Sequence, residues 1–245
     1  MSVVQTEKLT KIYGRGDTAV TALKAVNIRL KAGEFVAVMG PSGCGKSTLL
    51  HMIGGLDRPT SGRVLVAGHN LAQLNDNALT ELRRRKIGFV FQFYNLIPVL
   101  TALENAALPL ILDGLPPPRA RAQAEEWLAR FGMQARAAHR PDRLSGGEQQ
   151  KVAIARALVA EPALILADEP TGNLDSFAAD DVAGLLRRIA GDWGRTVLMV
   201  THNPRLSAYA DRIIFLKDGA VVDDARIAGG AEGAAQTVQP RVEGQ

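Results

Sequence analysis

Residues 34–53 have the sequence EFVAVMGPSGCGKSTLLHMI, in which an apolar run, a glycine-rich turn and a helical run follow one another. The segment FVAVM at residues 35–39 carries no charge, as expected of a strand that is buried on both faces of a sheet. The turn and the helical run at residues 47–53 follow directly. This order of strand, tight turn and helix predicts one unit of a parallel α/β sheet.

The turn, GPSGCGKST at residues 40–48, matches the phosphate-binding pattern G-x-x-x-x-G-K-[ST]. Its glycines let backbone N–H groups converge on phosphate oxygens, and the helix start adds the positive end of its dipole. Lys46 is expected to reach the β- and γ-phosphates of a nucleotide, and the Ser47 hydroxyl to bind Mg²⁺. An ordinary glycine turn is the alternative. The predicted ATP-binding residues of this loop are Gly40, Pro41, Ser42, Gly43, Cys44, Gly45, Lys46, Ser47 and Thr48.

Cys44 lies at a variable position of this loop and is the single cysteine of the chain. One cysteine excludes an internal disulfide framework and suits a reducing compartment. The helix start and Lys46 would make the thiol of Cys44 reactive, which suggests a redox role. The alternative, a small side chain that the loop tolerates, is favoured.

Two carboxylates, Asp168 and Glu169, follow another buried run, ALILA at residues 163–167. The carboxyl ends of parallel strands are where open α/β sheets bind ligands. Asp168 is therefore expected to hold Mg²⁺ through its water shell, and Glu169 to polarise a water for attack on the γ-phosphate. His202 follows a third buried run, TVLMV at residues 196–200, and is expected to contact the γ-phosphate from the same edge; a satisfied loop histidine is the alternative.

The remaining patterns predict the rest of the fold. Buried runs separated by helix-like segments such as residues 177–190 favour a parallel α/β core. Apolar alternation at the start of the chain and again at residues 20–30 predicts two antiparallel strands, joined by a turn at residues 14–17. Residues 101–112 and 118–131 have helical periodicity, and Gly114 and the prolines at 116–118 are predicted to break the chain between them. A helical insertion at about residues 93–160 follows.

Composition limits the partners that this chain can have. Its 245 residues, 47% hydrophobic, suffice for one compact α/β unit. The net charge of +4 would suit nucleic acid or an anionic membrane, but the basic run at residues 83–86 lacks interleaved aromatics, so solvated charge at an exposed helix end and no nucleic-acid partner are expected. No stretch approaches the roughly 18 apolar residues of a membrane span, and the start lacks a secretory signal. Residues 225–245 have the composition of a flexible tail.

A second anion site is predicted at LSGGEQ, residues 144–149, which opens another helical run. With this motif the sequence resembles the ABC ATPases, in which the LSGGE element of one protomer closes over the γ-phosphate held by the other. The resemblance implies a P-loop NTPase with a RecA-like core over residues 1–224, acting as a head-to-tail homodimer that binds two ATP molecules. The residues implied to bind ATP in trans are Ser145, Gly146, Gly147, Glu148 and Asp175, the last within GNLD at 172–175.

Further family elements occur in the same order as in that family. Tyr13 matches the aromatic residue that stacks on adenine, and Gln92 follows GFVF as the Q-loop glutamine. Each of these residues has a plain structural alternative when it is taken singly. Tyr13 could be an ordinary strand residue, Gln92 a loop amide, and Asp175 a charge at a helix N-terminus. The roles implied by the resemblance are catalytic for Glu169, His202, Lys46 and Gln92, and Mg²⁺ binding for Ser47, Gln92 and, through water, Asp168.

A narrower resemblance is to the macrolide exporters, lipoprotein-release ATPases and cell-division ATPases (MacB, LolD and FtsE types). It rests on GGLDRPTSG at 54–62, RRRKIGFVFQ at 83–92, NLIP at 95–98 and TGNLD at 171–175. Lys151 departs from the arginine common in that group, which keeps the charge but loses a bidentate contact. ABC ATPases of DNA repair or translation are disfavoured because the chain has no coiled coil, zinc insert or second cassette.

This subfamily implies a transport ATPase that works through separate integral-membrane permease subunits and a periplasmic adaptor. The chain is then expected at the cytoplasmic face of the inner membrane, held there by the permease. Residues 93–108 would form the permease groove, although the core of the helical subdomain is the alternative for any one of their apolar side chains. An FtsE-like ATPase that signals through a non-transporting permease in cell division is the alternative function, and the cargo is not encoded in this chain.

Overall fold

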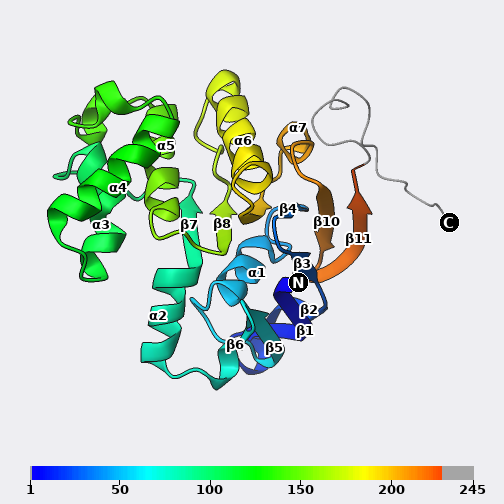
Figure 1. Cartoon of the computed structure of the whole chain (residues 1–245). Helices are drawn as coiled ribbons and strands as arrows, with labels where there is room; N and C mark the ends of the chain where they lie inside the picture. Colours follow the sequence, from blue (N-terminus) through cyan, green and yellow to red (C-terminus); the bar gives the residue numbers. More distant parts are fainter. Residues whose placement is uncertain (1, 228–245) are drawn as a thin grey trace.

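The computed structural model describes residues 2–227, in which a six-stranded sheet forms the centre (Figure 1). Its strand order is β11-β10-β4-β9-β8-β7, and every neighbouring pair is parallel except β10 with β11. The buried runs of the sequence are therefore neighbours in one parallel sheet, as predicted. Its strands are β4 (Phe35–Met39), β7 (Ile87–Phe91), β8 (Leu164–Asp168), β9 (Thr196–Val200), β10 (Arg212–Lys217) and β11 (Ala220–Arg226).

A smaller antiparallel sheet lies beside it, with order β2-β1-β5-β6 and β3 paired to β1. The prediction of a single strand over residues 20–30 is wrong in detail. The first strand ends at Val26, and after Asn27 and Ile28 the chain pairs with β1 again, near the other end of that strand. The result is two short strands in place of one. The strands are β1 (Ser2–Tyr13), β2 (Val20–Val26), β3 (Arg29–Lys31), β5 (Ser61–Val66) and β6 (His69–Asn70).

Helices α3, α4 and α5 pack on one another and stand together at one side of the core in Figure 1. The chain breaks between α3 and α4, as predicted, and Pro117 and Pro118 occupy the first turn of α4, where a fixed φ and a missing N–H are tolerated. The helices are α1 (Lys46–Ile53), α2 (Asp76–Lys86), α3 (Ala102–Leu112), α4 (Pro117–Arg130), α5 (Gly146–Leu158), α6 (Ser176–Gly191) and α7 (Pro204–Ser207), with 3-10 turns η1 (Gly16–Thr18), η2 (Leu71–Gln73), η3 (Gln134–Arg136) and η4 (Pro141–Arg143).

The central strand β4 is fully buried and divides two hydrophobic clusters. Phe35, Ala37 and Met39 face the cluster that contains side chains of α5 and α6, whereas Val36 and Val38 face α1 and the antiparallel sheet. Alternation along one strand thus anchors both halves of the molecule, as period-two side-chain placement requires. The phosphate-binding loop leaves β4 from the middle of this core.

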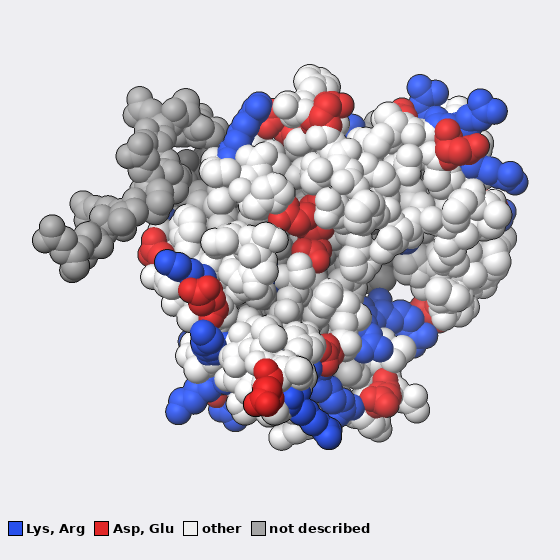
Figure 2. All heavy atoms as spheres, turned by 180° about the vertical axis from the view of Figure 1, so that it is seen from behind, with Lys and Arg blue, Asp and Glu red and all other residues white. Residues whose placement is uncertain are grey.

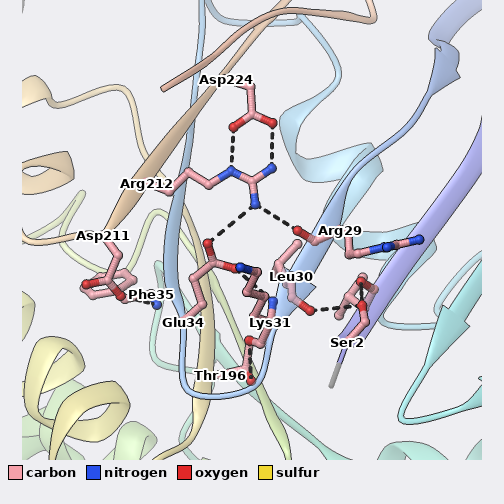
Figure 3. A network of polar contacts seen from close by, with 11 residues as sticks. Ser2, Arg29, Leu30, Lys31, Glu34, Phe35, Thr196, Asp211, Arg212 and Asp224 are labelled. Carbon is pink, nitrogen blue, oxygen red and sulfur yellow. Dashed lines mark hydrogen bonds and ion pairs between the residues drawn. The ribbon is translucent and has the colours of Figure 1, made fainter. Parts of the chain in front are cut away.

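The end of the described chain is an edge strand held by a polar network (Figure 3). The guanidinium of Arg212 donates two hydrogen bonds to the carboxylate of Asp224 and one to the Arg29 carbonyl. Pairing continues through Arg226, so residues 225 and 226, which were expected to open the tail, belong to β11. The rest of the expected tail, residues 228–245, lies outside the described residues.

The surface of residues 2–227 mixes both signs of charge. On the face shown in Figure 2, Lys and Arg side chains alternate with Asp and Glu around the rim, as expected of ordinary solvated charge. The basic run at residues 83–86 ends α2 directly before β7, as predicted, at the helix terminus that favours positive charge. Within residues 2–227, none of the helices is long and apolar enough to span a membrane.

Candidate nucleotide-binding site

The loop between β4 and α1 depends on its glycines. Gly40, Gly43 and Gly45 have φ values of 151, 77 and 104, which side-chain-bearing residues rarely adopt. A Cβ on Gly40 would lie 2.1 Å from the Leu216 carbonyl oxygen, and one on Gly45 would lie 2.3 Å from that of Ala22. Gly45 is also the N-cap of α1 and has no side chain to cap it. The helix start is therefore left to bind an anion.

Lys46, the first residue of α1, is buried beneath this loop. Its ammonium group donates to the carbonyl oxygens of Gly40 and Pro41, at 2.9 Å each. Two neutral carbonyls compensate a positive charge less well than phosphate oxygens do. The lysine is thus positioned where a bound phosphate would draw it.

Ser47 and Asp168 are 121 residues apart in sequence but touch in the fold. The Ser47 hydroxyl donates to Asp168 Oδ1 at 3.1 Å, because α1 starts beside the end of β8. Burial raises the pKa of the Asp168 carboxyl, and the Ser47 hydrogen bond partly offsets this. Hard oxygen donors of this kind suit Mg²⁺, which keeps water and phosphate ligands, so a three-residue metal cluster is not needed. No such cluster of His, Cys, Asp or Glu occurs within residues 2–227.

Glu169 and His202 lie together at the same sheet edge, with Nδ1 of His202 2.9 Å from Glu169 Oε1. The Glu169 carboxylate is shielded, with 18% of the side chain exposed, whereas His202 is 71% exposed. Glu169 has φ 46, and its N–H donates to the Val200 carbonyl. A non-glycine residue held in the left-handed region is strained, and such strain concentrates at functional sites.

Gln92 follows β7 and forms a reciprocal pair with Asn173. Its amide nitrogen donates to Asn173 Oδ1 at 3.1 Å, and the Asn173 amide donates to the Gln92 carbonyl at 3.3 Å. Gly172 is needed beside this pair, because a Cβ there would lie 2.7 Å from Gln92 Nε2. Sequence reasoning quoted Asn173 but did not identify it as a partner of Gln92.

Tyr13 is half-exposed and anchored by two residues that sequence reasoning missed. Its hydroxyl donates to Asp57 Oδ2 at 3.0 Å, and Lys11 Nζ lies 4.8 Å from its ring centroid. Lys11 also pairs with Asp57 at 2.8 Å. Burial, followed by the hydrogen bond with Asp57, raises the pKa of Tyr13. Asp57 lies in the GGLDRPTSG segment, whose position beside β1 could not be read from the sequence.

Cys44 is 6% exposed and packs in the cluster between α1 and the antiparallel sheet. Reactive cysteines are accessible to solvent, whereas buried ones are inert. The geometry therefore favours the tolerated small side chain over the redox role.

The second predicted anion site begins α5, whereas the first begins α1, and the two helices stand apart in Figure 1. The Ser145 hydroxyl accepts from the Glu148 N–H at 3.2 Å, and Glu148 Oε2 accepts from the Ser145 N–H at 2.8 Å. Gly147 lies against Ala178 of α6, whose N-cap is Asp175. Of the hydrogen bonds of residues 2–227, none joins residues 145–148 to residues 40–48. The two predicted anion sites are thus not joined by a hydrogen bond within one chain.

Comparison with known proteins identifies the family of this chain. The family model described as ABC transporter matches residues 23–172. The lipoprotein-releasing system ATP-binding protein LolD of Geobacter metallireducens is 50% identical over 223 residues, covering 91% of this chain and 99% of that protein. The macrolide export ATP-binding/permease protein MacB of Hyphomonas neptunium is 44% identical over 222 residues, which are 91% of this chain and only 34% of that longer protein.

A solved structure extends the likeness to three dimensions. It is the dimeric post-hydrolysis state of the ATP-binding cassette MJ0796 bound to ADP and Pi, with 46% identity and a TM-score of 0.84. The alignment covers 92% of this chain and 99% of that one. MJ0796 comes from Methanocaldococcus jannaschii. The chain described here therefore belongs to the ABC transporter family, as one of its ATP-binding and ATP-hydrolysing cassettes.

Proposed function

We propose that this chain is the ATPase subunit of a LolD- or MacB-like system that exports or extracts a substrate through a separate permease. Two contacts at the carboxyl ends of β8 and β9 support the proposal: Ser47 bonds Asp168, and Glu169 bonds His202. The relatives named LolD and MacB, the second of which carries a permease in its name, support work with permease subunits.

The phosphate-binding residues support ATP binding in two steps. The N–H groups of residues 40–48 would converge on phosphate at the start of α1, and the exposed ring of Tyr13 would stack on adenine. Lys46 exchanges the Gly40 and Pro41 carbonyls for the β- and γ-phosphates. The Ser47 hydroxyl and the Gln92 amide oxygen would hold Mg²⁺, with Asp168 acting through a water. When bound, Mg²⁺ would neutralise charge that develops on the phosphates.

Hydrolysis needs a base beside the γ-phosphate. Glu169 is shielded and held at the edge of the sheet by its own backbone, so its free oxygen can accept the proton of an attacking water. His202 orients the Glu169 carboxylate through Nδ1 and leaves its other ring nitrogen for the γ-phosphate. Gln92, which Asn173 holds by a hydrogen bond, would position the attacking water relative to the metal.

The second half of each site would come from another copy. Ser145, Gly146, Gly147, Glu148 and Asp175 would contact the nucleotide held by the partner's loop, which makes the dimer head-to-tail. The permease would dock near residues 93–108, where Phe93 is 72% exposed and Ile97 is also exposed, while Tyr94 and Leu96 are partly buried. The chain would then sit at the cytoplasmic face of the inner membrane through the permease, which works with a periplasmic adaptor.

Substitution Glu169→Gln tests the proposal, because it removes the base and keeps the shape. The variant should bind ATP and accumulate as a dimer in size-exclusion chromatography, while phosphate release falls by about 10²–10³-fold. Glu126→Gln, an exposed glutamate of α4, is the control and should leave both unchanged. Hydrolysis at the parental rate in Glu169→Gln would refute the assignment of the base.

A further inference from the structure

Arg156, in the last turns of α5, holds the turn that follows Gln92. Its guanidinium donates to the carbonyl oxygen of Tyr94 at 2.8 Å and to that of Asn95. Burial lowers the pKa of Arg156. Among the ion pairs of residues 2–227, none includes Arg156. A shielded charge that is compensated only by two backbone carbonyls is costly, so its geometry is closely tied to that turn.

The turn itself is strained. Tyr94 and Asn95 have φ values of 60 and 49, in the left-handed region that glycine adopts most easily. Consecutive residues in this region persist only where the surrounding structure holds them. Arg156 supplies two of the hydrogen bonds that do so, and Gln92 lies only two residues before the turn.

Tyr94 also reaches the start of the same helix. A Cβ on Gly146 would lie 2.8 Å from the Tyr94 hydroxyl, so the ring is in close contact with the LSGGE element. Tyr94 thus contacts α5 near both ends of the helix. Its carbonyl accepts from Arg156, and its hydroxyl lies against Gly146. The turn is therefore fixed to α5 at two points.

We propose that Arg156 is a positioning residue for Gln92, and that Arg156 and Tyr94 tie Gln92 to the helix that carries Ser145. The inference rests on the proposed function, in which Gln92 serves the ATP of its own loop while residues 145–148 serve the partner's ATP. The tie then links the two ATP sites of the dimer: nucleotide contact at the start of α5 sets the position of Gln92 at the other site. This is coupling through one rigid element that both sites contact.

The experiment measures steady-state hydrolysis by Arg156→Gln, Arg156→Lys and the parent at increasing ATP concentrations. Arg156→Gln should lower kcat by about tenfold with KM within about twofold, because transition-state positioning is lost and ATP binding is not. It should also reduce the Hill coefficient towards one, since the link between sites is cut. Arg156→Lys should have a kcat between those of Arg156→Gln and the parent, because lysine keeps the charge but lacks the forked donors of arginine.

A second substitution separates positioning from folding. Asn95→Gly relieves part of the backbone strain, so the double variant Arg156→Gln/Asn95→Gly should regain about threefold in kcat, whereas Arg156→Gln/Asn95→Ala should regain nothing. Arg195→Gln is the matched control. Arg195 also donates to the carbonyl of a left-handed residue, Glu161, which lies away from Gln92.

The inference would be overturned if Arg195→Gln lost as much kcat as Arg156→Gln. It would also be overturned if the glycine and alanine double variants had equal kcat. Parental kcat and Hill coefficient in Arg156→Gln would overturn it as well. These outcomes are distinct from failure of the proposed function, which would appear as unchanged hydrolysis in Glu169→Gln. If Arg156→Gln lowers the melting temperature, the comparison of the two double variants still decides, because they share that loss.

Discussion

The two helix starts proposed to bind phosphate, those of α1 and α5, are built in opposite ways. Gly45 caps α1 in a left-handed conformation with no side-chain hydrogen bond. Ser145 and Glu148 cap α5 reciprocally in a capping box. The first helix start leaves its N–H groups to a ligand, whereas the second already satisfies part of its donors with its own side chains.

This contrast predicts that the start of α1 can bind a nucleotide within one chain, whereas the start of α5 cannot. The loop before α1 has a buried lysine and an adjacent serine–aspartate pair, so one chain can hold a nucleotide there. The start of α5 carries the carboxylate of Glu148. The hydrogen bond from the Ser145 N–H lowers the pKa of this carboxyl, which favours its ionised form. A phosphate must meet that carboxylate, so the second site is expected to bind only a nucleotide that the partner already holds.

Removal of Lys46 should give the largest effect. Lys46→Ala should lower kcat by about 10²–10³-fold, because the charge that follows the β- and γ-phosphates is lost. Phosphate release measures the rate, and equilibrium dialysis of ATP should show weaker binding by the isolated chain. Lys86→Ala, at the exposed end of α2, is the control and should match the parent. Unaltered ATP binding and hydrolysis in Lys46→Ala would contradict the first half-site.

Ser145→Ala should spare ATP binding but weaken the dimer. In the Glu169→Gln background, ATP-driven dimerisation should weaken by about tenfold, because a hydroxyl at the helix start no longer meets the partner's phosphate. The lost cap also costs about 1 kcal/mol of stability. Thr101→Ala is the matched control, since Thr101 and Glu104 form the same capping box on α3. It should lose similar stability and keep the dimer; equal dimer loss in both variants would mean that Ser145 acts only as a cap.

A mixture of Lys46→Ala with Ser145→Ala should hydrolyse ATP faster than the mean of the two variants measured separately. In a head-to-tail dimer of Lys46→Ala with Ser145→Ala, one composite site carries both changes and the other carries neither. Random pairing makes about half of the dimers mixed, so recovery of up to about one quarter of the parental rate is expected if the sites act independently. The rate of the mixture is compared with the mean of the separate variants. A mixture no faster than that mean would argue against shared sites.

Much of the nucleotide site follows from the sequence because its parts lie at strand ends. Asp168 and His202 each lie within two residues of the end of a buried run, and parallel strands bring their carboxyl ends to one edge. The contact of Glu169 with His202 was not itself predictable. It depends on the left-handed backbone of Glu169, which only the packed sheet imposes.

Other features required the fold. Asp57 meets Tyr13 because the segment after α1 passes β1, a pairing that no local pattern encodes. The break between β2 and β3 was missed for the same reason, since propensity marks where a chain can bend but tertiary contacts decide whether it does. Arg156 drew no notice in the sequence because its partners are backbone carbonyls.

The smallest predicted effect concerns the carboxylate that α5 already holds. Glu148→Gln keeps an acceptor for the Ser145 N–H and removes a negative charge near the expected phosphate, so dimerisation by ATP in the Glu169→Gln background should tighten by about two- to tenfold. The gain should shrink at high salt, because exposed charges are screened. Analytical ultracentrifugation at two salt concentrations measures both.

Glu104→Gln, the same change in the capping box of α3, should leave dimerisation unchanged. The pKa of Glu148 is lowered in the folded chain, so its contribution to stability is present above the usual carboxyl range and is lost as pH falls through the lowered value. Glu148→Gln should accordingly be slightly less stable than the parent at neutral pH, and this difference should vanish in acid. A looser dimer in Glu148→Gln would mean that the carboxylate itself contacts the partner, and that the two helix starts are more alike than their caps suggest.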